Sequence, residues 1–256
     1  MCRHLAYLGP PVDLATLLCE PPHSLLRQSY APADMRGGGT VNADGFGAGW
    51  YQPGGEAPSR YRRAVPMWTD TSFAGLAPTV RSGAVLAAVR AASPGMPVVE
   101  TACAPFRWGG WLFSHNGVVR GWPGSVASLA ARLPVTDLLT LDAPTDSALL
   151  AALVADRLRA GADAAAALST VVAEVAAAAP NSRLNLLLTD GRMIAATAVR
   201  HALSVRRADG AVVVASEPID HHPGWQRVPD NHLLVATPAA VDLRAIAVPT
   251  TTAEEP

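Results

Sequence analysis

The residue best suited to covalent chemistry in this chain is Cys2, which directly follows the initiator Met1. Removal of Met1 would place a thiol and a free α-amine on one residue, so that the nucleophile would carry its own base. An unperturbed thiol has a pKa of about 8.5 and an α-amine a pKa of about 7.7 to 8.0, so near neutral pH part of the amine can accept the thiol proton. Most cysteines at this position are inert, so Cys2 becomes a candidate nucleophile only through the residues that accompany it.

Arg90 is the first of these residues, because it interrupts the otherwise apolar segment 85–92. A buried guanidinium without a partner is costly, so Arg90 must meet an anion. That anion could be structural, with Asp44 and Glu100 as candidates, or it could be the carboxylate of a substrate. Arginine can hold a carboxylate through two parallel hydrogen bonds, which lysine cannot reproduce.

Asn116-Gly117 and Asp146 are the other two candidates, and both have structural explanations. Asn-Gly is the dipeptide preferred in tight hairpin turns. Asp146 stands between Thr145 and Ser147 at the start of a predicted helix, where it could serve only as a capping residue. The same groups can also bind: a side-chain amide and a free backbone N–H can hold an oxyanion, and a carboxylate can hold an amine.

The composition describes a protein of 256 residues with 50% hydrophobic and 16% charged residues. No linker or repeat divides the sequence, so we expect a single domain over residues 2–249, followed by a flexible tail over 250–256. The formal net charge of -1 provides no basic surface for nucleic acid, and no stretch approaches the roughly 20 apolar residues that cross a bilayer. We therefore expect a small-molecule substrate and neither a nucleic-acid nor a membrane partner, and a homodimer is possible.

The cysteines and the missing lysines narrow the chemistry further. Three cysteines cannot all pair, and Cys2, Cys19 and Cys103 lie far apart in the sequence, which argues against a disulfide framework. Charged residues and prolines interrupt residues 1–20, so no signal peptide is expected and the predicted location is the cytoplasm. The chain contains no lysine, which excludes Schiff-base chemistry, a pyridoxal phosphate anchor and a Walker-type phosphate loop.

Hydrophobic periodicity predicts strands first, helices in the middle and strands again. The first part should hold a strand at 2–8 that Pro10 and Pro11 stop, a helix near Asp13, a helix at 71–81 and a buried strand at 85–92. Hairpins are predicted over 46–52 with 59–64 and over 111–115 with 118–120. The helices of the middle part are expected at 145–160 and 164–178.

After Pro180 the period changes to two residues, and turn signals at Asp190-Gly191 and Asp209-Gly210 predict hairpins. The strands are expected at 184–189, 193–199, 203–207, 212–216, 232–237 and 241–248. This order predicts an α+β fold in which two antiparallel sheets stack face to face and helices cover their outer faces.

Several motifs along the chain together resemble the class II glutamine amidotransferases, a family of N-terminal nucleophile hydrolases with a four-layer αββα sandwich. Each motif alone is weak, but five in this order over more than half of the chain are fairly specific. They are M-C-R-H-L at the start, N-A-D-G-F-G-A-G-W-Y at 42–51, A-V-R-A-A-S at 88–93, F-S-H-N-G-V-V at 113–119 and T-D-S at 145–147. Three later motifs resemble the ergothioneine-biosynthesis branch of γ-glutamyl hercynylcysteine S-oxide hydrolases. They are S-E-P-I-D at 216–220, P-G-W at 223–225 and V-P-D-N-H-L-L at 228–234.

The resemblance implies catalytic roles for Cys2, Asn116 and Gly117 once Met1 is removed. Cys2 would attack the γ-carbonyl and form a γ-glutamyl thioester, with its α-amine relaying the proton through a water to the leaving amine. The Asn116 side-chain amide and the Gly117 N–H would hold the oxyanion, and such donors are typically worth about 2.7 to 4 kcal/mol each. Water would then release glutamate, and neither a cofactor nor a metal is expected.

The resemblance also implies that Arg90 binds the glutamyl α-carboxylate and Asp146 the α-amine. Synthase-linked members of the family commonly have an aromatic residue after the arginine and a threonine-histidine pair beyond it, whereas this chain has Ala-Ala-Ser-Pro at 91–94. Smaller side chains leave room for a substrate larger than glutamine, and Ser93 could donate a hydrogen bond to the glutamyl carboxylate.

The expected reaction is therefore hydrolysis of a γ-glutamyl amide, which in the ergothioneine branch converts γ-glutamyl hercynylcysteine S-oxide to glutamate and hercynylcysteine S-oxide. The trimethylated betaine of such a substrate needs a site for a cationic head, and aromatic faces are the usual solution. The candidates are Trp68, Trp108 and Trp111. Two alternatives stay open: a glutaminase subunit that supplies ammonia to a separate synthase, and a non-catalytic binding protein with the same fold.

Two further patterns are not given a function. His221-His222 with Asp220 resembles a metal cluster, but adjacent histidines on a strand point to opposite sides and no third ligand stands at a metal-site spacing. The glycines over 37–49 are not a dinucleotide fingerprint, because no strand-turn-helix unit surrounds them. His115, beside the candidate oxyanion residue, is expected to pack or to form hydrogen bonds and not to transfer protons.

Overall fold

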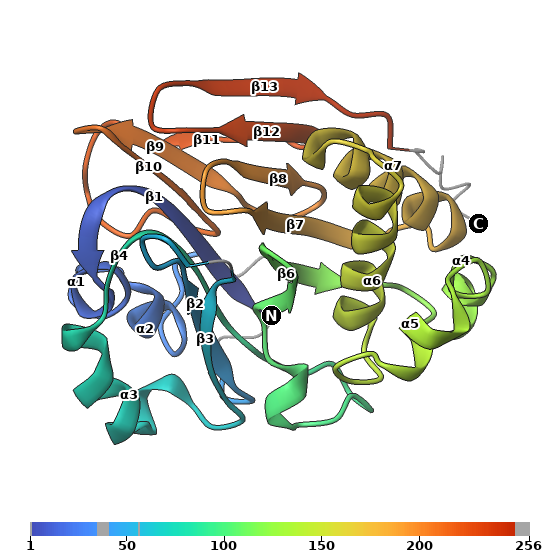
Figure 1. The fold of residues 1–256 in the computed structure, drawn as a ribbon, viewed down its shortest axis with the longest axis horizontal. Coiled ribbons are helices and arrows are strands. Elements are labelled where there is room, and N and C mark those ends of the chain that lie inside the picture. Colours follow the sequence, from blue (N-terminus) through green and yellow to red (C-terminus); the bar gives the residue numbers. More distant parts are fainter. Residues whose placement is uncertain (1, 35–40, 56, 249–256) are drawn as a thin grey trace.

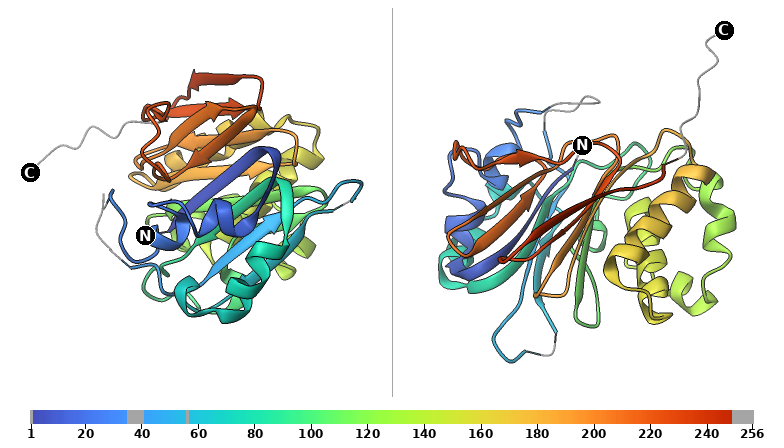
Figure 2. Two further views of the ribbon diagram at one scale, coloured as in Figure 1. Left: turned by 90° about the vertical axis from the view of Figure 1, so that its left-hand side faces the viewer. Right: turned by 90° about the horizontal axis from the view of Figure 1, so that it is seen from above.

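The computed structural model describes residues 2–34, 41–55 and 57–248 of the chain. Met1, the run Gly37-Gly38-Gly39 and the tail over 250–256 lie outside the described residues. The described chain forms two antiparallel sheets stacked face to face (Figure 1). Seen from above, helices flank the pair of sheets on both sides (Figure 2), so the predicted α+β sandwich is confirmed.

The first sheet has seven strands in the order β11-β9-β10-β1-β4-β2-β3. Strand β1 is the middle one of the seven, and Cys2 directly precedes it, which places the candidate nucleophile at the end of a central strand. The strands are β1 (Arg3–Asp13), β2 (Phe46–Trp50), β3 (Ser59–Arg63), β4 (Arg81–Val89), β9 (Ser204–Ala208), β10 (Ala211–Ala215) and β11 (Gln226–Arg227).

The second sheet has six strands in the order β13-β12-β8-β7-β6-β5. Its strands are β5 (Phe106–Trp108), β6 (Trp111–Val118), β7 (Arg183–Thr189), β8 (Ile194–Ala198), β12 (His232–Ala236) and β13 (Val241–Ala245). The α-helices are α1 (Leu14–Leu18), α2 (Leu25–Gln28), α3 (Thr71–Leu76), α4 (Ala127–Ala130), α5 (Val135–Leu139), α6 (Asp146–Arg159) and α7 (Ala164–Ala178). Short 3-10 helices are η1 (Met67–Thr69), η2 (Ala77–Thr79), η3 (Glu100–Ala102) and η4 (Gly124–Val126). Within the described residues, no helix combines the length and apolar character that a membrane crossing requires.

Three hydrophobic clusters fill the spaces between these layers. One packs α6 and α7 against the six-stranded sheet, one packs α1 to α3 against the seven-stranded sheet, and the third lies between the two sheets. Strand β1 contributes to two of them: Leu5 and Tyr7 face the helices, whereas Ala6 and Leu8 face the other sheet. Since side chains alternate along a strand, the even-numbered positions, which include Cys2 and His4, are directed toward the second sheet.

The long helices and several turns agree with their sequence signals. Helix α6 begins where the Thr145 hydroxyl accepts the N–H of Ala148 at 3.2 Å, and the alanine-rich segment 164–178 forms α7 as predicted. Hairpins join β7 to β8 and β9 to β10 at the predicted Asp-Gly turns. The predicted β2–β3 hairpin is also present.

Three local predictions are wrong. Strand β1 does not stop at Pro10 but continues to Asp13, because an irregularity between Leu8 and Val12 carries the chain past the prolines while only β4 pairs with it there. The predicted helix at 71–81 ends as α3 at Leu76 and is followed by η2. The predicted hairpin at Asn116-Gly117 does not form, since both residues lie within β6 and pair with β7.

Candidate active site

Cys2 lies at one end of the seven-stranded sheet, where the start of β1 meets the end of its neighbour β4. Arg3 pairs with Val89 of β4, which places Cys2 beside Arg90, the next residue along that strand. The thiol of Cys2 is half-buried and lies 3.7 Å from the carbonyl oxygen of Ala91. Two adjoining cavities share Cys2, Arg90 and Ser147. The first also includes His115, and the second also includes Ser93, Gly117 and Asp146.

Arg90 brings a buried positive charge to this site. Its side chain is 9% exposed, and its Nη1 donates a hydrogen bond to the carbonyl oxygen of Pro97 at 2.9 Å. Neither expected structural partner neutralises it: Asp44 accepts the N–H of Ala92, and no ion pair joins Arg90 to Glu100 or to any other carboxylate within the described residues. A buried guanidinium without a carboxylate partner is suited to binding an anion that enters the cavity.

Asp146 lines the second Cys2 cavity from the start of α6, which packs against the six-stranded sheet. It is the first residue of α6, but Thr145 is the residue that caps the helix. The two carboxylate oxygens of Asp146 accept the backbone N–H groups of Val119, at 3.0 Å, and of Ser147, at 2.7 Å. These bonds fix the carboxylate at the cavity wall, and each oxygen still has a lone pair that can accept a hydrogen bond from a bound ammonium group.

Asn116 and Gly117 approach Cys2 from β6 of the opposite sheet. Asn116 is fully buried, and its Nδ2 donates a hydrogen bond to the hydroxyl of Ser216 at 3.0 Å. A Cβ atom on Gly117 would lie 1.8 Å from the carbonyl oxygen of Arg183, so only glycine fits at this position. The fit therefore explains the Asn-Gly pair without a turn.

The pairing of β6 also determines the direction of the Gly117 N–H. Opposite Gly117 lies Leu184, whose N–H donates to the carbonyl oxygen of Val199 at 3.1 Å, on the side of β7 away from β6. In an antiparallel ladder both members of such a pair turn their backbone groups outward, so the Gly117 N–H points away from β7. Strand β5 pairs with β6 only as far as Phe113, so it leaves the Gly117 N–H unused in the ladder. The free donor required for an oxyanion is thus supplied by a strand edge.

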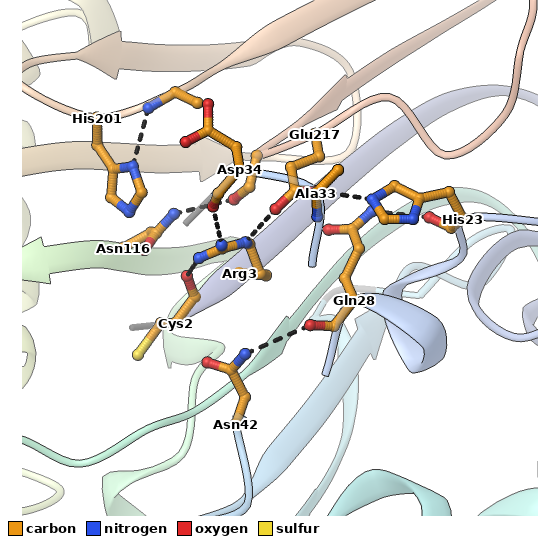
Figure 3. Close-up of polar contacts among 12 residues, drawn as sticks. Cys2, Arg3, His23, Gln28, Ala33, Asp34, Asn42, Asn116, His201 and Glu217 are labelled. Carbon is orange, nitrogen blue, oxygen red and sulfur yellow. Dashed lines mark hydrogen bonds and ion pairs between the residues drawn. The ribbon is translucent and has the colours of Figure 1, made fainter. Parts of the chain in front are cut away.

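Arg3 and Glu217 hold the main chain of Cys2, the candidate nucleophile, through contacts that the sequence did not reveal. Arg3 is 1% exposed and its Nη1 donates to the carbonyl oxygen of Cys2 at 3.0 Å. Its Nε forms an ion pair with Glu217 at 2.6 Å, and its Nη2 donates to the carbonyl oxygen of Asp34 (Figure 3). Burial alone would raise the pKa of Glu217, but hydrogen bonds from His23 and the Ala33 N–H, together with the charge of Arg3, hold that pKa below its usual value. The network fixes the main chain of Cys2 while its sulfur points away from Arg3 (Figure 3).

Histidines near the site are placed for structural roles. Burial, followed by the charges of His201, His115 and Arg3, lowers the pKa of His4 to about 3, so His4 is neutral. His115 Nε2 lies 3.0 Å from the carbonyl oxygen of Arg183 and its Nδ1 lies 3.0 Å from the Ser147 hydroxyl. A carbonyl can only accept, so Nε2 carries a proton and donates it to Arg183, while Nδ1 forms the second hydrogen bond with Ser147. Both nitrogens are thereby engaged.

The other predicted substrate-binding residues divide into two groups. Ser93 lines the second Cys2 cavity. The tryptophans lie elsewhere: Trp68 is 41% exposed beside Tyr30, Trp108 lines a separate cavity next to α6, and Trp111 does not line either Cys2 cavity. Their predicted betaine-binding role stays untested and gains no support from this placement. Within the described residues no group of three or more histidine, cysteine, aspartate or glutamate side chains could hold a metal ion.

Comparison with known proteins decides the family. The sequence profile of the family described as "Glutamine amidotransferases class-II" matches residues 13–210. A protein of Mycolicibacterium smegmatis named gamma-glutamyl-hercynylcysteine sulfoxide hydrolase is 46% identical over 91% of this chain and 95% of its own length. A protein of the same name from Mycobacterium tuberculosis is 44% identical over 96% of this chain and 97% of its own length. The chain belongs to the class-II glutamine amidotransferases.

Solved structures agree with this membership at the level of the fold. A class-II glutamine aminotransferase domain protein from Silicibacter pomeroyi superposes with a TM-score of 0.70 at 23% identity, over 96% of this chain and 100% of the other. The glutamine phosphoribosylpyrophosphate amidotransferase of Bacillus subtilis superposes with a TM-score of 0.64 at 15% identity, over 97% of this chain and 50% of the other. The predicted family and fold are both confirmed. For this amidotransferase, the individual roles of the site residues stay predictions.

Proposed function

We propose that this protein hydrolyses a γ-glutamyl amide bond, and that its substrate is γ-glutamyl hercynylcysteine sulfoxide, the compound named in the two mycobacterial relatives. The observation that carries the proposal is the second Cys2 cavity, which contains a thiol, the unpaired guanidinium of Arg90 and the carboxylate of Asp146. The two charges are complementary to the α-carboxylate and α-ammonium groups of a glutamyl moiety. Identity of 44% to 46% with relatives over nearly their whole length supports the choice of substrate.

In the proposed first step, the thiol of Cys2 transfers its proton to the free α-amine, and the sulfur attacks the γ-carbonyl carbon. The carbonyl oxygen becomes an oxyanion that accepts hydrogen bonds from Asn116 Nδ2 and from the outward-pointing N–H of Gly117. The C–N bond then breaks as the proton passes from the α-amine to the leaving nitrogen. The products of this step are a free amine and a γ-glutamyl thioester on Cys2.

In the second step, water attacks the thioester carbon while the α-amine of Cys2 accepts one of its protons. The same two donors hold the second oxyanion, and departure of the thiolate releases glutamate. The thiolate recovers its proton from the α-ammonium group, which returns the protein to its starting state. Arg90, Asp146 and Ser93 hold the glutamyl group throughout, so the carbonyl carbon stays within reach of the sulfur.

Intact-mass measurement tests this proposal. The purified protein should lack Met1, and brief incubation with the substrate should add the mass of one γ-glutamyl group. Cys2→Ala should show neither the adduct nor glutamate release. Cys19→Ala is the matched control, because burial, followed by the charges of Glu20 and Asp13, raises the pKa of the Cys19 thiol to about 11 and makes it a poor nucleophile. Full activity of a form that retains Met1 would contradict the mechanism.

The same experiments separate the alternative functions. A glutaminase subunit would turn over glutamine rapidly only with its synthase present, and a non-catalytic binding protein would leave Cys2 unlabelled by a glutamine-analogue diazo-ketone. We further propose that the protein works in the cytoplasm on a small-molecule substrate, without a nucleic-acid partner, and that a homodimer is possible. The absence of disulfides among Cys2, Cys19 and Cys103 supports the reducing compartment.

A further inference from the structure

A much larger cavity lies on the opposite side of β1 from the two Cys2 cavities. Its volume is 980 Å³, and Ser216 and Glu217, the residues that follow β10, form part of its wall. Arg27 at α2 and Arg227 in β11 also line it. We name this space the β10-side cavity. Its volume is in the range of cavities that enclose small organic ligands, whereas an ammonia molecule would need no such space.

Sheet topology places Cys2 between this cavity and the glutamyl site. Strand β1 pairs with β4 on one side and with β10 on the other. The end of β4 supplies Arg90 to the Cys2 cavities, and the end of β10 supplies Ser216 and Glu217 to the β10-side cavity. Both strand ends lie at the same end of the sheet as Cys2, which directly precedes β1.

Direct contacts join the wall of the β10-side cavity to the reacting groups. The Ser216 hydroxyl accepts the side-chain N–H of Asn116, one of the proposed oxyanion donors, at 3.0 Å. Glu217 pairs with Arg3, whose Nη1 holds the carbonyl oxygen of Cys2 at 3.0 Å (Figure 3). The cavity therefore begins one side chain away from the nucleophile and from the oxyanion site.

The scissile amide has two halves on opposite sides of its carbonyl carbon. In the proposed function, the glutamyl half lies on the Arg90 side of Cys2. The amine half must then extend away from Arg90, toward the end of β10. We propose that the β10-side cavity is the subsite for the leaving amine, and that Arg27 and Arg227 bind a carboxylate of that amine; this inference rests on the proposed function.

The charges that line the cavity favour an anionic group over a cationic one. The three acids that line it are all engaged: Glu217 by Arg3 and His23, Asp220 by Arg206 at 2.6 Å, and Asp34 also by a partner. In contrast, within the described residues neither arginine of the proposed subsite has a carboxylate partner. Arg27 packs over the ring of Tyr30 at 5.2 Å, and Arg227 forms no ion pair with any residue that the structure describes. The available charge is therefore positive, and it complements the carboxylate of an amino-acid leaving group.

The experiment compares the wild-type protein with the double variant Arg27→Gln/Arg227→Gln. Both side chains are exposed, so the variant should fold normally. With γ-glutamyl hercynylcysteine sulfoxide, kcat/KM should fall about fivefold to tenfold, mainly through KM, as expected for the loss of two partly solvated charge pairs. With glutamine, whose leaving group is ammonia, it should change less than twofold. Arg207→Gln, an exposed arginine on β9 outside the cavity, is the matched control and should match the wild type on both substrates.

A binding measurement tests the subsite without turnover. Hercynylcysteine sulfoxide should bind to Cys2→Ala protein, and its Kd should rise about fivefold to tenfold when both arginines are replaced. Equal losses on both substrates, or an unchanged Kd, would overturn the subsite while leaving the hydrolase proposal intact. A wild-type protein that releases glutamate from neither substrate, but whose Kd responds to the arginines, would instead refute the proposed function and retain the binding site.

Discussion

Replacement of Ser216 by alanine should test whether Ser216 positions the proposed oxyanion donor Asn116, in addition to stabilising the fold. The buried Ser216 hydroxyl accepts two hydrogen bonds, from the backbone N–H of His4 at 2.9 Å and from Asn116 Nδ2 at 3.0 Å. Alanine removes the acceptor and leaves two buried donors without a partner. An unsatisfied buried donor costs about 1 to 3 kcal/mol, so the loss of both bonds should decrease the free energy of unfolding by about 2 to 6 kcal/mol.

The effect on catalysis follows from the second of these bonds. Complete loss of an oxyanion donor typically costs about 2.7 to 4 kcal/mol in the transition state, which is about 100-fold to 1000-fold in kcat. Ser216→Ala keeps the Asn116 amide but frees it to rotate, so we expect part of that loss, about 10-fold to 100-fold in kcat. KM should change little, because Arg90 and Asp146, which we propose hold the glutamyl group, lie on the other side of Cys2.

Glutamate release under saturating substrate measures kcat, and denaturant unfolding measures stability on the same samples. Ser114→Ala is the control, because its buried hydroxyl lies 3.3 Å from His4 Nδ1 in the same layer. No hydrogen bond between the side chains of Ser114 and Asn116 is present within the described residues, so this control should lose some stability but keep kcat within about twofold of the wild type. In an Asn116→Ala background, Ser216→Ala should reduce kcat no further. Additive losses in the double variant, or a normal kcat for Ser216→Ala, would refute the positioning role.

Three other changes test the site independently. Gly117→Ala should lower Tm by several degrees in a thermal melt, because its Cβ would lie 1.8 Å from the carbonyl oxygen of Arg183, and a normal melt would contradict the close packing. Arg90→Lys should raise the KM for γ-glutamyl substrates about tenfold with little change in kcat, because lysine cannot bind a carboxylate bidentately; a kcat defect alone would argue against carboxylate binding. Burial lowers the pKa of His4 from 6.5 to about 3. At acidic pH the unfolded state therefore binds a proton at His4 that the folded state does not, which favours unfolding. The contribution of neutral His4 to the free energy of unfolding is complete above pH 6.5. It is lost as the pH falls toward 3, by about 1.4 kcal/mol per pH unit. His4→Gln should flatten that slope in urea titrations between pH 7 and 5, and an unchanged slope would exclude His4 as its source.

Turn-forming dipeptides in the sequence predict a turn correctly only where no longer-range strand pairing competes with it. Asp190-Gly191 forms the expected turn because the chain reverses there to pair β7 with β8, with Thr189 opposite Ile194. Asn116-Gly117 carries the same kind of signal and fails, because β7 pairs with β6 straight through it. The turn propensity of a dipeptide is a local preference, and a full ladder with a buried face outweighs it.

The candidate site divides in the same way between what the sequence can show and what only the fold shows. Cys2 and Arg90 stand out because a thiol beside the N-terminus and a charge inside an apolar strand are unusual in themselves. The pairing of Arg3 with Glu217 could not be predicted, since 214 positions separate the two residues and many other arginines could have met that carboxylate. The available signal was the odd-numbered position of Arg3 in a strand whose side chains alternate between faces. That position placed Arg3 on a buried face, where a guanidinium needs an acid. Residue type alone makes the tryptophans candidates, and residue type does not determine which face of the fold a side chain occupies.

The position of β1 reverses a common property of chain ends. Terminal segments usually fray and exchange their amide protons quickly, but here the first strand is clamped between two partners at the heart of a seven-stranded sheet. Backbone amides a few positions from the thiol of Cys2 should therefore be among the slowest in the molecule to take up deuterium. Heating or denaturant cannot loosen the beginning of this polypeptide without dismantling the sheet, so loss of turnover and loss of native structure should occur in one transition.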